Sequence, residues 1–434
     1  MKIAILGYDV EGRSSLEYFA AQGHDLTICD RDRSVKVPKG VPSVLGDGYL
    51  DDLDRFDLLV RTAGLAPQAI LDRNPGVAGK ITSQINEFLK VYPTRNVIGV
   101  TGTKGKGTTS TLIARMLEAA GQQVRLGGNI GVPPLSFLPG LKADSWVVLE
   151  LSSFQLADLQ ASPHMAVCLM VVPEHLDWHR DTDEYLKAKS RLFAHQSPED
   201  IAIYFSENKT SERIAAGGQG QKIPYYAPPG AHVAEEQIVI DDQVICPVSE
   251  VKLLGRHNLQ NICAAVTAAW QVTQNVPALK KVIKGFSGLP YRLEFRREAH
   301  GVRYYNDSFA ATPPAPAAAL TAIPGKKVLI VGGYERGLDL TELAGAIRSN
   351  STSLRQVLLI GASAQRVADA ALKKDGFTGY TLSKAKDMAG IVAEATALAR
   401  PGDAVVLSPG FPSFDMFKNF EDRGNQFNEA VDKL

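Results

Sequence analysis

The sequence predicts an α/β protein with mainly parallel sheets, arranged in three domains. Short apolar runs rich in β-branched residues alternate along the chain with stretches of helical periodicity, a pattern typical of strands covered by helices on both faces. A length of 434 residues corresponds to about three domains of ~150 residues each. Breaks between the apolar patterns place these domains at residues 1–91, 92–289 and 290–434.

The overall charge and the cysteine content exclude several classes of protein. The 47 Lys and Arg residues balance 47 Asp and Glu residues, so no net field favours nucleic acid or a membrane surface. Four scattered cysteines without a C-x-x-C pair argue against a disulfide framework or a zinc site. No apolar run approaches the ~20 residues of a membrane span, and no signal peptide precedes the first strand. We therefore expect a cytoplasmic enzyme.

The N-terminal domain is expected to be Rossmann-like. A first strand leads through a turn into a helix, and a second strand ends at Asp30, where an acid can bind a ribose or base hydroxyl. The dinucleotide fingerprint G-x-G-x-x-G is altered, because Asp9 stands between Gly7 and Gly12. The loss of the middle glycine argues against NAD, since that glycine allows close approach of a pyrophosphate. The same pattern also fits a βαβ unit that binds no nucleotide.

A glycine-rich turn at 102–108 is the strongest signal in the sequence. It follows an apolar strand pattern at 97–101 and precedes a helical one, an arrangement that directs backbone N–H groups and a helix N-terminus at phosphate oxygens. Lys106 is expected to reach the β- and γ-phosphates. Thr108 is expected to bind Mg2+, since Gly107 stands where a serine or threonine usually follows the lysine. The alternative is a tight turn with an exposed lysine. The ATP-binding residues expected here are Gly102, Thr103, Lys104, Gly105, Lys106, Gly107 and Thr108.

Further polar residues of the central domain follow predicted strands or begin a predicted helix. Glu150 ends an apolar strand pattern; because a buried unpaired acid is costly, we expect it to bind Mg2+. His175, in a loop with flanking carboxylates, is either a metal ligand, an acid–base group or an incidental loop residue. Asn258 and Asn261 stand in the first turns of a helix, where they either cap it or bind an adenine edge.

The C-terminal domain again alternates strands and helices, which predicts a second Rossmann-like parallel sheet. Continuous apolar strand patterns recur through it, as at 327–333 and 404–408. Asp307, Arg336 and Ser413 all follow strand ends, where open α/β sheets bind their ligands.

Several motifs, taken in order, resemble those of the Mur ligase family over the whole chain. Such a series is far more specific than any one motif. The stretches that carry the resemblance are GTKGKGT at 102–108, GGNIG at 127–131, LELSSFQL at 149–156, EHLD at 174–177, HNLQN at 257–261, GLPYR at 288–292, NDS at 306–308 and SFDMFKNF at 413–420.

The resemblance implies an ATP-dependent amide ligase with UDP-binding, ATP-binding and glutamate-binding domains, built around a central P-loop sheet. It implies that glutamate, expected as D-glutamate, is joined to UDP-N-acetylmuramoyl-L-alanine through an acyl phosphate in peptidoglycan precursor synthesis. The implied cofactors are ATP and two Mg2+ ions, and a monomer acting on these small molecules is expected. Two anions meet during phosphoryl transfer, so Mg2+ and Lys106 have to screen both.

The resemblance also implies roles for individual residues. Thr108 and Glu150 match a first magnesium site and His175 a second. Lys189 matches a lysine that the family carbamylates into a ligand of the second magnesium; without the resemblance, the lysines of this helix indicate a solvated face. The implied catalytic residues are Lys106, Glu150, His175 and Lys189; the remaining ATP-binding residues are Asn258, Asn261, Arg292 and Asp307; the UDP-substrate residues are Val10, Glu11, Asp30, Gly64, Asn129, Ser152 and Gln155; and the glutamate-binding residues are Arg336, Ser413 and Phe420.

Departures from the family pattern leave alternatives open. Gly107 replaces a serine, as in the related folylpolyglutamate synthases, so a ligase of that type is one alternative. Phe309 occupies the place of a lysine that holds the carboxylate of the incoming glutamate, and Arg336 replaces a second lysine with a planar cation. L-Glutamate or another acceptor is therefore a further alternative. The intact catalytic set disfavours a protein that binds a nucleotide without catalysis.

Overall fold

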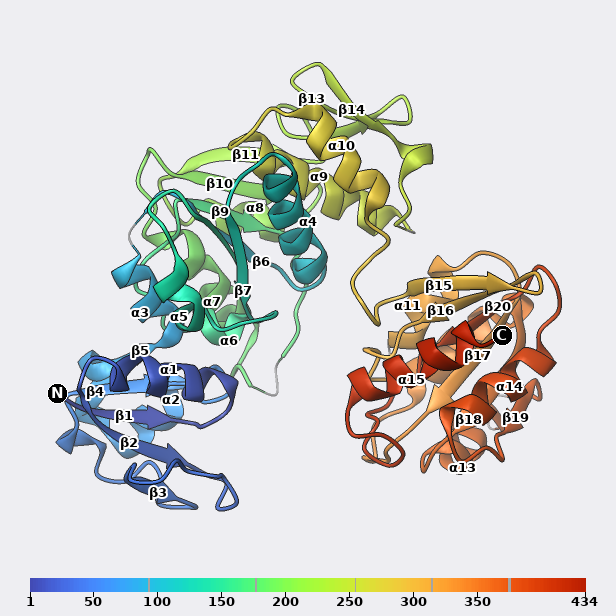
Figure 1. Cartoon of the computed structure of the whole chain (residues 1–434), viewed down its shortest axis with the longest axis horizontal. Coiled ribbons are helices and arrows are strands. Elements are labelled where there is room, and N and C mark those ends of the chain that lie inside the picture. Colours follow the sequence, from blue (N-terminus) through green and yellow to red (C-terminus); the bar gives the residue numbers. More distant parts are fainter. Residues whose placement is uncertain (93, 176–177, 254, 314, 374–375) are drawn as a thin grey trace. The chain divides into compact units, whose positions relative to one another are not determined.

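The computed structural model describes residues 1–92, 94–175, 178–253, 255–313, 315–373 and 376–434, which fold into two compact units (Figure 1). The first unit contains Met1–Lys252 and Arg256–Phe286, and the second contains Leu253–Gly255 and Ser287–Leu434. Both units are α/β structures with mainly parallel sheets, which confirms the predicted fold class. The division into three domains stays a prediction. No helix among the described residues is long and apolar enough to cross a membrane.

The first sheet of the first unit has five parallel strands in the order β3-β2-β1-β4-β5. Asp9, which replaces the middle glycine of the motif after β1, has a structural role here. Its side chain accepts hydrogen bonds from the backbone N–H groups of Glu11 and Gly12 and so caps the first helix. The strands are β1 (Lys2–Leu6), β2 (Asp25–Asp30), β3 (Ser43–Leu45), β4 (Leu58–Arg61) and β5 (Ile81–Ser83), and the helices are α1 (Val10–Ala20), α2 (Pro67–Arg73) and α3 (Gln84–Val91).

The second sheet of this unit has six parallel strands in the order β11-β10-β9-β6-β8-β7. Since β6 lies between β8 and β9, the carboxyl ends of these three strands meet at one edge, and the loops that follow them lie together. The strands are β6 (Val97–Thr101), β7 (Val124–Gly128), β8 (Trp146–Glu150), β9 (Met165–Cys168), β10 (Ile201–Phe205) and β11 (Gln221–Tyr225), and the helices are α4 (Lys106–Ala119), α5 (Pro134–Phe137), α6 (Ser153–Leu156), α7 (Thr182–Ala194), α8 (Lys209–Ala215) and α9 (Arg256–Trp270).

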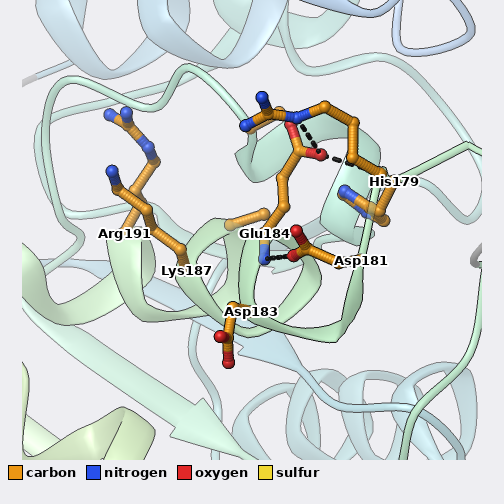
Figure 2. Close-up of a pocket in the computed structure, with 9 residues that line it drawn as sticks. His179, Asp181, Asp183, Glu184, Lys187 and Arg191 are labelled. Carbon is orange, nitrogen blue, oxygen red and sulfur yellow. Dashed lines mark hydrogen bonds and ion pairs between the residues drawn. The ribbon is translucent and has the colours of Figure 1, made fainter.

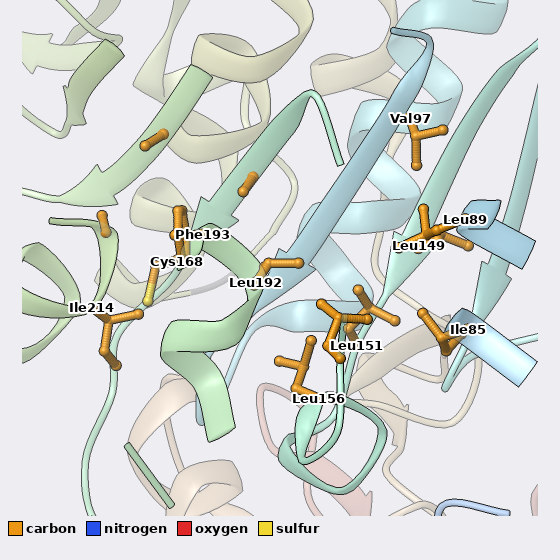
Figure 3. Close-up of a cluster of buried hydrophobic side chains, with 14 of the residues drawn as sticks. Ile85, Leu89, Val97, Leu149, Leu151, Leu156, Cys168, Leu192, Phe193 and Ile214 are labelled. Carbon is orange, nitrogen blue, oxygen red and sulfur yellow. The ribbon is translucent and has the colours of Figure 1, made fainter. Parts of the chain in front are cut away.

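One hydrophobic cluster connects the two sheets of the first unit. Ile85 and Leu89 of α3 belong to the same buried cluster as Leu149 of β8 and Leu192 and Phe193 of α7 (Figure 3). Because α3 directly follows the last strand of the first sheet, its apolar face is buried against the central sheet. Removal of this apolar surface from water fixes the first sheet to the second.

A small antiparallel sheet completes the first unit. It contains β12 (His232–Ala234), β13 (Gln237–Ile240) and β14 (Gln243–Pro247), next to α10 (Val276–Gly285). The chain turns between β13 and β14 at Asp241 and Asp242, whose φ angles of 46° and 59° fit a tight two-residue hairpin.

The second unit has a six-stranded sheet in the order β15-β16-β20-β17-β18-β19, in which only the β15–β16 pair is antiparallel. Successive residues of β17 enter different cores: Leu329 faces one buried cluster and Ile330 faces another. Burial on both faces explains the continuous apolar pattern of the strand. The strands are β15 (Glu294–Ala299), β16 (Val302–Asn306), β17 (Lys327–Gly332), β18 (Leu354–Ile360), β19 (Tyr380–Leu382) and β20 (Ala404–Leu407), and the helices are α11 (Ala315–Ala322), α12 (Thr341–Ser349), α13 (Ala364–Val367), α14 (Met388–Leu398) and α15 (Phe420–Asp432).

A buried arginine fixes α15 to this sheet. The Arg423 side chain is fully buried; its Nε donates to Ser308 Oγ (2.9 Å), and its terminal nitrogens donate to Ser308 O (2.8 Å) and Phe411 O (3.0 Å). Burial lowers the pKa of Arg423 to about 10, which still leaves it charged at neutral pH. The guanidinium therefore holds together the turn after β16, the loop after β20 and the last helix.

We predict that Arg423→Met destabilises the second unit by about 3 kcal/mol, because it leaves two buried carbonyl groups without donors. Hydrogen exchange followed by mass spectrometry should show faster exchange in α15 and β16 and unchanged exchange in the first unit. Arg296→Met is the control, since Arg296 pairs with Asp432 on the surface and should cost less than about 1 kcal/mol. Equal destabilisation by both variants would contradict the prediction.

Candidate active site

The phosphate loop lies between the end of β6 and the start of α4. Two of its positions have to be glycine, because neighbouring residues pack directly against the loop backbone. Gly102 has φ +149° and Gly105 has φ +90°, conformations that other residues rarely adopt. A Cβ atom on Gly102 would lie 2.7 Å from Leu169 Cβ, and one on Gly105 would lie 2.2 Å from Asn261 Oδ1. The loop therefore leads into the N-terminus of α4 as predicted, with Asn261 of α9 packed directly against it.

Two lysine ammonium groups meet at one carbonyl oxygen of this loop. Lys106 Nζ donates to Gly102 O (3.0 Å) and Thr103 O (3.0 Å), and Lys189 Nζ donates to Gly102 O (2.9 Å). Lys189 is 2% exposed. Burial and the positive charge of Lys106 lower the pKa of Lys189 from 10.5 to about 7. Near neutral pH a large share of the Lys189 amine is therefore unprotonated.

Glu150 lies beside the loop at the end of β8, and Asn129 holds its side chain. Strands β6 and β8 pair with Val100 opposite Glu150. Asn129 Nδ2 donates to Glu150 Oε1 (2.8 Å), and the backbone N–H of Asn129 donates to Glu150 O (2.8 Å). The other carboxylate oxygen of Glu150, Oε2, forms no hydrogen bond with any described residue. A buried carboxylate with one open oxygen is a suitable ligand for a hard cation.

The loop after β9 carries His175 in an unusual backbone conformation, with φ +60°. The centroid of its ring lies 4.9 Å from that of Phe154 and 6.5 Å from that of Tyr185, and its Nε2 lies 3.6 Å from Glu174 Oε2. The motif that carries the family resemblance continues into residues 176–177, which lie outside the described residues. Aromatic side chains from two helices therefore border His175.

Tyr185, which no motif in the sequence marks as a site residue, connects the phosphate loop to Lys189. The Tyr185 hydroxyl and Thr103 Oγ1 form a hydrogen bond of 2.8 Å, and Lys189 Nζ lies 4.7 Å from the centre of the Tyr185 ring. A spacing of four on a predicted helix places Tyr185 and Lys189 on one face. The link to Thr103 could not be found in this way, because Thr103 is 82 positions away.

The remaining predicted ATP-binding residues of this unit occupy the loop, α4 and α9. Lys104 is exposed, and Thr108 lies partly exposed in the first turn of α4. Asn258 and Asn261 lie inside α9, where Asn261 Nδ2 donates to Asn258 Oδ1 (3.1 Å). Neither Asn258 nor Asn261 precedes the helix as its N-cap residue, since the helix begins at Arg256; contact with an adenine edge stays a prediction.

The residues predicted for the UDP-substrate come together where α1 and the end of β4 meet α6. Glu11 Oε2 accepts a hydrogen bond from the Ala63 backbone N–H (2.8 Å), and Glu11 Oε1 accepts one from Gln155 Nε2 (2.6 Å). Burial raises the pKa of Glu11. Ser152 caps α6 in a reciprocal capping box with Gln155. Glu11 thus links the first sheet to α6 through both of its carboxylate oxygens.

The other predicted UDP-substrate residues lie at the carboxyl edges of the same two sheets. Asp30 ends β2 and accepts a hydrogen bond from the Tyr8 backbone N–H (2.6 Å). Gly64 O accepts a hydrogen bond from Trp178 Nε1 (3.2 Å), and Val10 begins α1 with 65% of its surface exposed. Asn129 follows β7. These positions agree with the general rule that open α/β sheets bind ligands beyond the carboxyl ends of their strands.

A separate cavity of about 310 Å³ opens beside the N-terminal half of α7 (Figure 2). Arg180 Nε pairs with Glu184 Oε2 (3.2 Å), and Asp181 caps α7 by accepting from the Glu184 backbone N–H (2.8 Å). Lys187 and Arg191 lie on the following turns of the helix. The cavity contains none of the residues predicted from the sequence.

In the second unit, predicted residues gather at the carboxyl ends of β16 and β20. Asp307 is buried, and its carboxylate accepts hydrogen bonds from Ser408 Oγ (2.7 Å) and the Leu293 backbone N–H (3.1 Å). Burial is the main cause that raises the pKa of Asp307 to about 7. The Arg292 guanidinium lies 3.9 Å from the centre of the Phe309 ring. The position expected to hold a lysine is thus occupied by an aromatic ring under an arginine.

The predicted glutamate-binding residues also lie in this unit. The Phe309 and Phe420 rings meet edge to face with centroids 5.1 Å apart. Ser413 is 2% exposed, and its carbonyl accepts the Phe417 backbone N–H (2.9 Å). Arg336 is exposed in the loop after β17. The structure therefore places Phe420 against Phe309.

Comparison with known protein families gives two matches. The model described as "Mur ligase middle domain" matches residues 100–269, and the one described as "Mur ligase, glutamate ligase domain" matches residues 291–411. Together they span more than half of the chain. The chain belongs to the Mur ligase family.

Relatives that align over their full length show that this Mur ligase is similar to proteins of the MurD type. It is 36% identical to a UDP-N-acetylmuramoylalanine–D-glutamate ligase of Symbiobacterium thermophilum, over 100% of this chain and 98% of that protein. A protein of the same name from Clostridium tetani is 33% identical, over 100% of this chain and 97% of its own length.

Solved structures of other Mur ligases share the fold. A MurF structure from Acinetobacter baumannii aligns with a TM-score of 0.63 and 18% identity, covering 99% of this chain and 93% of that chain. A MurF ligase from Thermotoga maritima in complex with ADP aligns with a TM-score of 0.59 and 20% identity, covering 99% and 95%.

We predict that the contribution of Lys189 to the stability of the first unit, measured as the difference between the wild type and Lys189→Met, rises as the pH increases from about 7 to about 10.5, because the unfolded chain binds the Lys189 proton in this range and the folded chain does not. Lys189→Met should remove this contribution from the pH profile and raise the free energy of unfolding at pH 7 by roughly 2–4 kcal/mol. Denaturant unfolding at a series of pH values measures both effects. The control is Lys187→Met, which changes an exposed lysine of the same helix; if its pH profile changed as much, the assignment to Lys189 would be wrong.

Proposed function

We propose that this Mur ligase is an ATP-dependent ligase that joins D-glutamate to UDP-N-acetylmuramoyl-L-alanine in peptidoglycan precursor synthesis. The observation that carries the proposal is the phosphate loop, where Lys106 and Lys189 converge on Gly102 O beside the buried Glu150. The end-to-end alignment with relatives named UDP-N-acetylmuramoylalanine–D-glutamate ligase supports the choice of substrates. We expect the enzyme to act as a monomer in the cytoplasm.

The reaction has two steps. A carboxylate oxygen of UDP-N-acetylmuramoyl-L-alanine attacks the γ-phosphorus of ATP, forming an acyl phosphate and releasing ADP. The amine of glutamate then attacks the acyl carbon, and phosphate leaves as the amide forms and the amine loses a proton. Both steps bring anions together, so the first need of the site is fixed positive charge. Lys106, the backbone N–H groups of the loop and the N-terminus of α4 supply it.

The residues present fit magnesium ions. Glu150, whose Oε2 accepts no hydrogen bond from the described residues, lies at the strand end next to the phosphate loop, and Thr108 lies in the first turn of α4. These two residues would hold one ion together with phosphate oxygens. His175 and Lys189, once carbamylated, would hold a second. The lowered pKa of Lys189 supports this modification, because only the unprotonated amine reacts with carbon dioxide. Bound Mg2+ neutralises phosphate charge during transfer.

The remaining substrate contacts are proposed on the matched positions. Asn258 and Asn261 from α9, with Arg292 and Asp307, would contact the adenosine of ATP. Glu11, Gln155 and Ser152 form a connected polar group, and we assign them, with Val10, Asp30, Gly64 and Asn129, to the UDP-substrate. Arg336, Ser413 and Phe420 are assigned to glutamate.

The deciding experiment measures phosphate release from ATP with Mg2+ and UDP-N-acetylmuramoyl-L-alanine, comparing D-glutamate, L-glutamate and other amino acids. We predict turnover with D-glutamate and at least about 100-fold less with L-glutamate, since opposite chirality misplaces the amine relative to the acyl carbon. If only another amino acid supports turnover, the enzyme is still a ligase of this kind, but glutamate is not its acceptor. Turnover with a folate in place of the UDP-substrate would favour a folylpolyglutamate synthase.

We predict that Arg336→Met raises the KM for glutamate about 10-fold or more and changes the KM for ATP little, because it removes a cation from the acceptor side. Arg336→Lys should recover much of the loss, since it keeps the charge. Steady-state kinetics with each substrate varied in turn measures both parameters. Arg336 would have no role in the acceptor site if Arg336→Met left the KM for glutamate unchanged.

A further inference from the structure

A fully buried arginine fixes the backbone of α6. The Arg61 side chain, at the end of β4, has no exposed surface. Its Nε and one terminal nitrogen bind both carboxylate oxygens of Asp158 (2.9 and 2.5 Å), and the same terminal nitrogen donates to Phe154 O (2.8 Å). The other terminal nitrogen donates to Leu65 O (3.0 Å) and Thr62 O (3.3 Å). A guanidinium engaged in this way holds its partners in a rigid, planar arrangement.

The ring of Phe154, on this fixed helix, borders the loop that follows β9. Its centroid lies 4.9 Å from that of His175 and 4.7 Å from that of the Trp178 ring. Trp178 in turn donates from Nε1 to Gly64 O (3.2 Å) on the first sheet. Trp178 is therefore held from two sides, by α6 and by the turn after β4.

The backbone of His175 needs such support. A non-glycine residue with φ +60° persists where its surroundings hold it there. The backbone N–H groups of Trp178 and His179 both donate to His175 O (3.1 and 3.0 Å), and the Phe154 ring packs against the imidazole. These contacts together determine where the imidazole lies.

We propose that Phe154 is a positioning residue for His175. Arg61, in this proposal, fixes the backbone that carries Phe154 and its neighbours Ser152 and Gln155. The turn at α6 would then have two roles: its polar side chains contact the UDP-substrate, and the Phe154 ring holds the imidazole of His175 in place. The assignment of a role in turnover rests on the proposed function, whereas the arrangement of the loop does not.

The test uses the full chain with Phe154→Leu and Phe154→Tyr. We expect Phe154→Leu to lower kcat about 10-fold, the size of a lost aromatic contact. The Kd of UDP-N-acetylmuramoyl-L-alanine, measured by calorimetry, should stay within about twofold, because Arg61 still holds the backbone around Ser152 and Gln155. Phe154→Tyr keeps the aromatic face and should retain most of kcat.

Arg61→Lys gives the complementary result. A lysine keeps the charge and loses the planar fork, so the Kd of the UDP-substrate should rise about 10-fold along with the fall in kcat. Phe19→Leu is the control, because it also removes an aromatic contact. The ring centroids of Phe19 and Tyr18 lie 5.0 Å apart near the end of α1. It should change neither constant.

A second measurement needs no substrate. The fluorescence of Trp178, taken as the difference between the wild type and Trp178→Phe, should shift to longer wavelength and be quenched more by acrylamide in Phe154→Leu. Unchanged kcat together with unchanged Trp178 emission in Phe154→Leu would overturn the proposal, as would an equal loss of kcat in Phe19→Leu. A wild-type protein that releases no phosphate with the UDP-substrate would reject the proposed function instead, and the Trp178 emission would still decide whether Phe154 sets the loop.

Discussion

The carbonyl oxygen of Gly102 is the point at which the charges of the site are concentrated. Lys106 reaches it from the start of α4 and Lys189 from α7, so two ammonium groups share one neutral acceptor. Burial and, after it, the like charge of Lys106 lower the pKa of Lys189 to about 7. A bound polyanion would stabilise such a site, because its negative charge would offset the two positive charges that the neutral carbonyl group leaves uncompensated.

Close packing around the loop keeps this geometry in place. Gly102 packs on Leu169 after β9, and Gly105 packs on Asn261 of α9. The loop therefore contacts two segments that lie far along the chain, and neither glycine leaves room for a side chain. Tyr185 adds a third contact through its hydroxyl to Thr103. The site is assembled from segments that only the parallel sheet brings to one edge.

Both units use a buried arginine for the same structural purpose. Arg61 binds an aspartate and backbone carbonyls and fixes α6, whereas Arg423 binds a serine and backbone carbonyls and fixes α15. In each case the guanidinium donates hydrogen bonds to backbone carbonyl groups, Phe154 O and Leu65 O for Arg61 and Ser308 O and Phe411 O for Arg423, and so helps to satisfy backbone acceptors inside the protein. The helices that carry Gln155 and Phe420 are thus attached by hydrogen bonds as well as by apolar packing.

Local chemistry was sufficient to predict much of this protein. Strand and helix periodicity predicted the α/β class, and the glycine turn predicted the loop before α4, since both depend on residues close together in the chain. Glu150 was predicted at a strand end in the same way, whereas its place beside the loop depends on the pairing of β6 with β8. The antiparallel pairing of β15 and the partners of Arg61, Phe154 and Tyr185 depended on tertiary structure. Arg61 and Asp158 are 97 positions apart, and no spacing rule connects them. The low pKa of Lys189 likewise required the fold, because burial and the approach of Lys106 exist only after α7 packs against the loop.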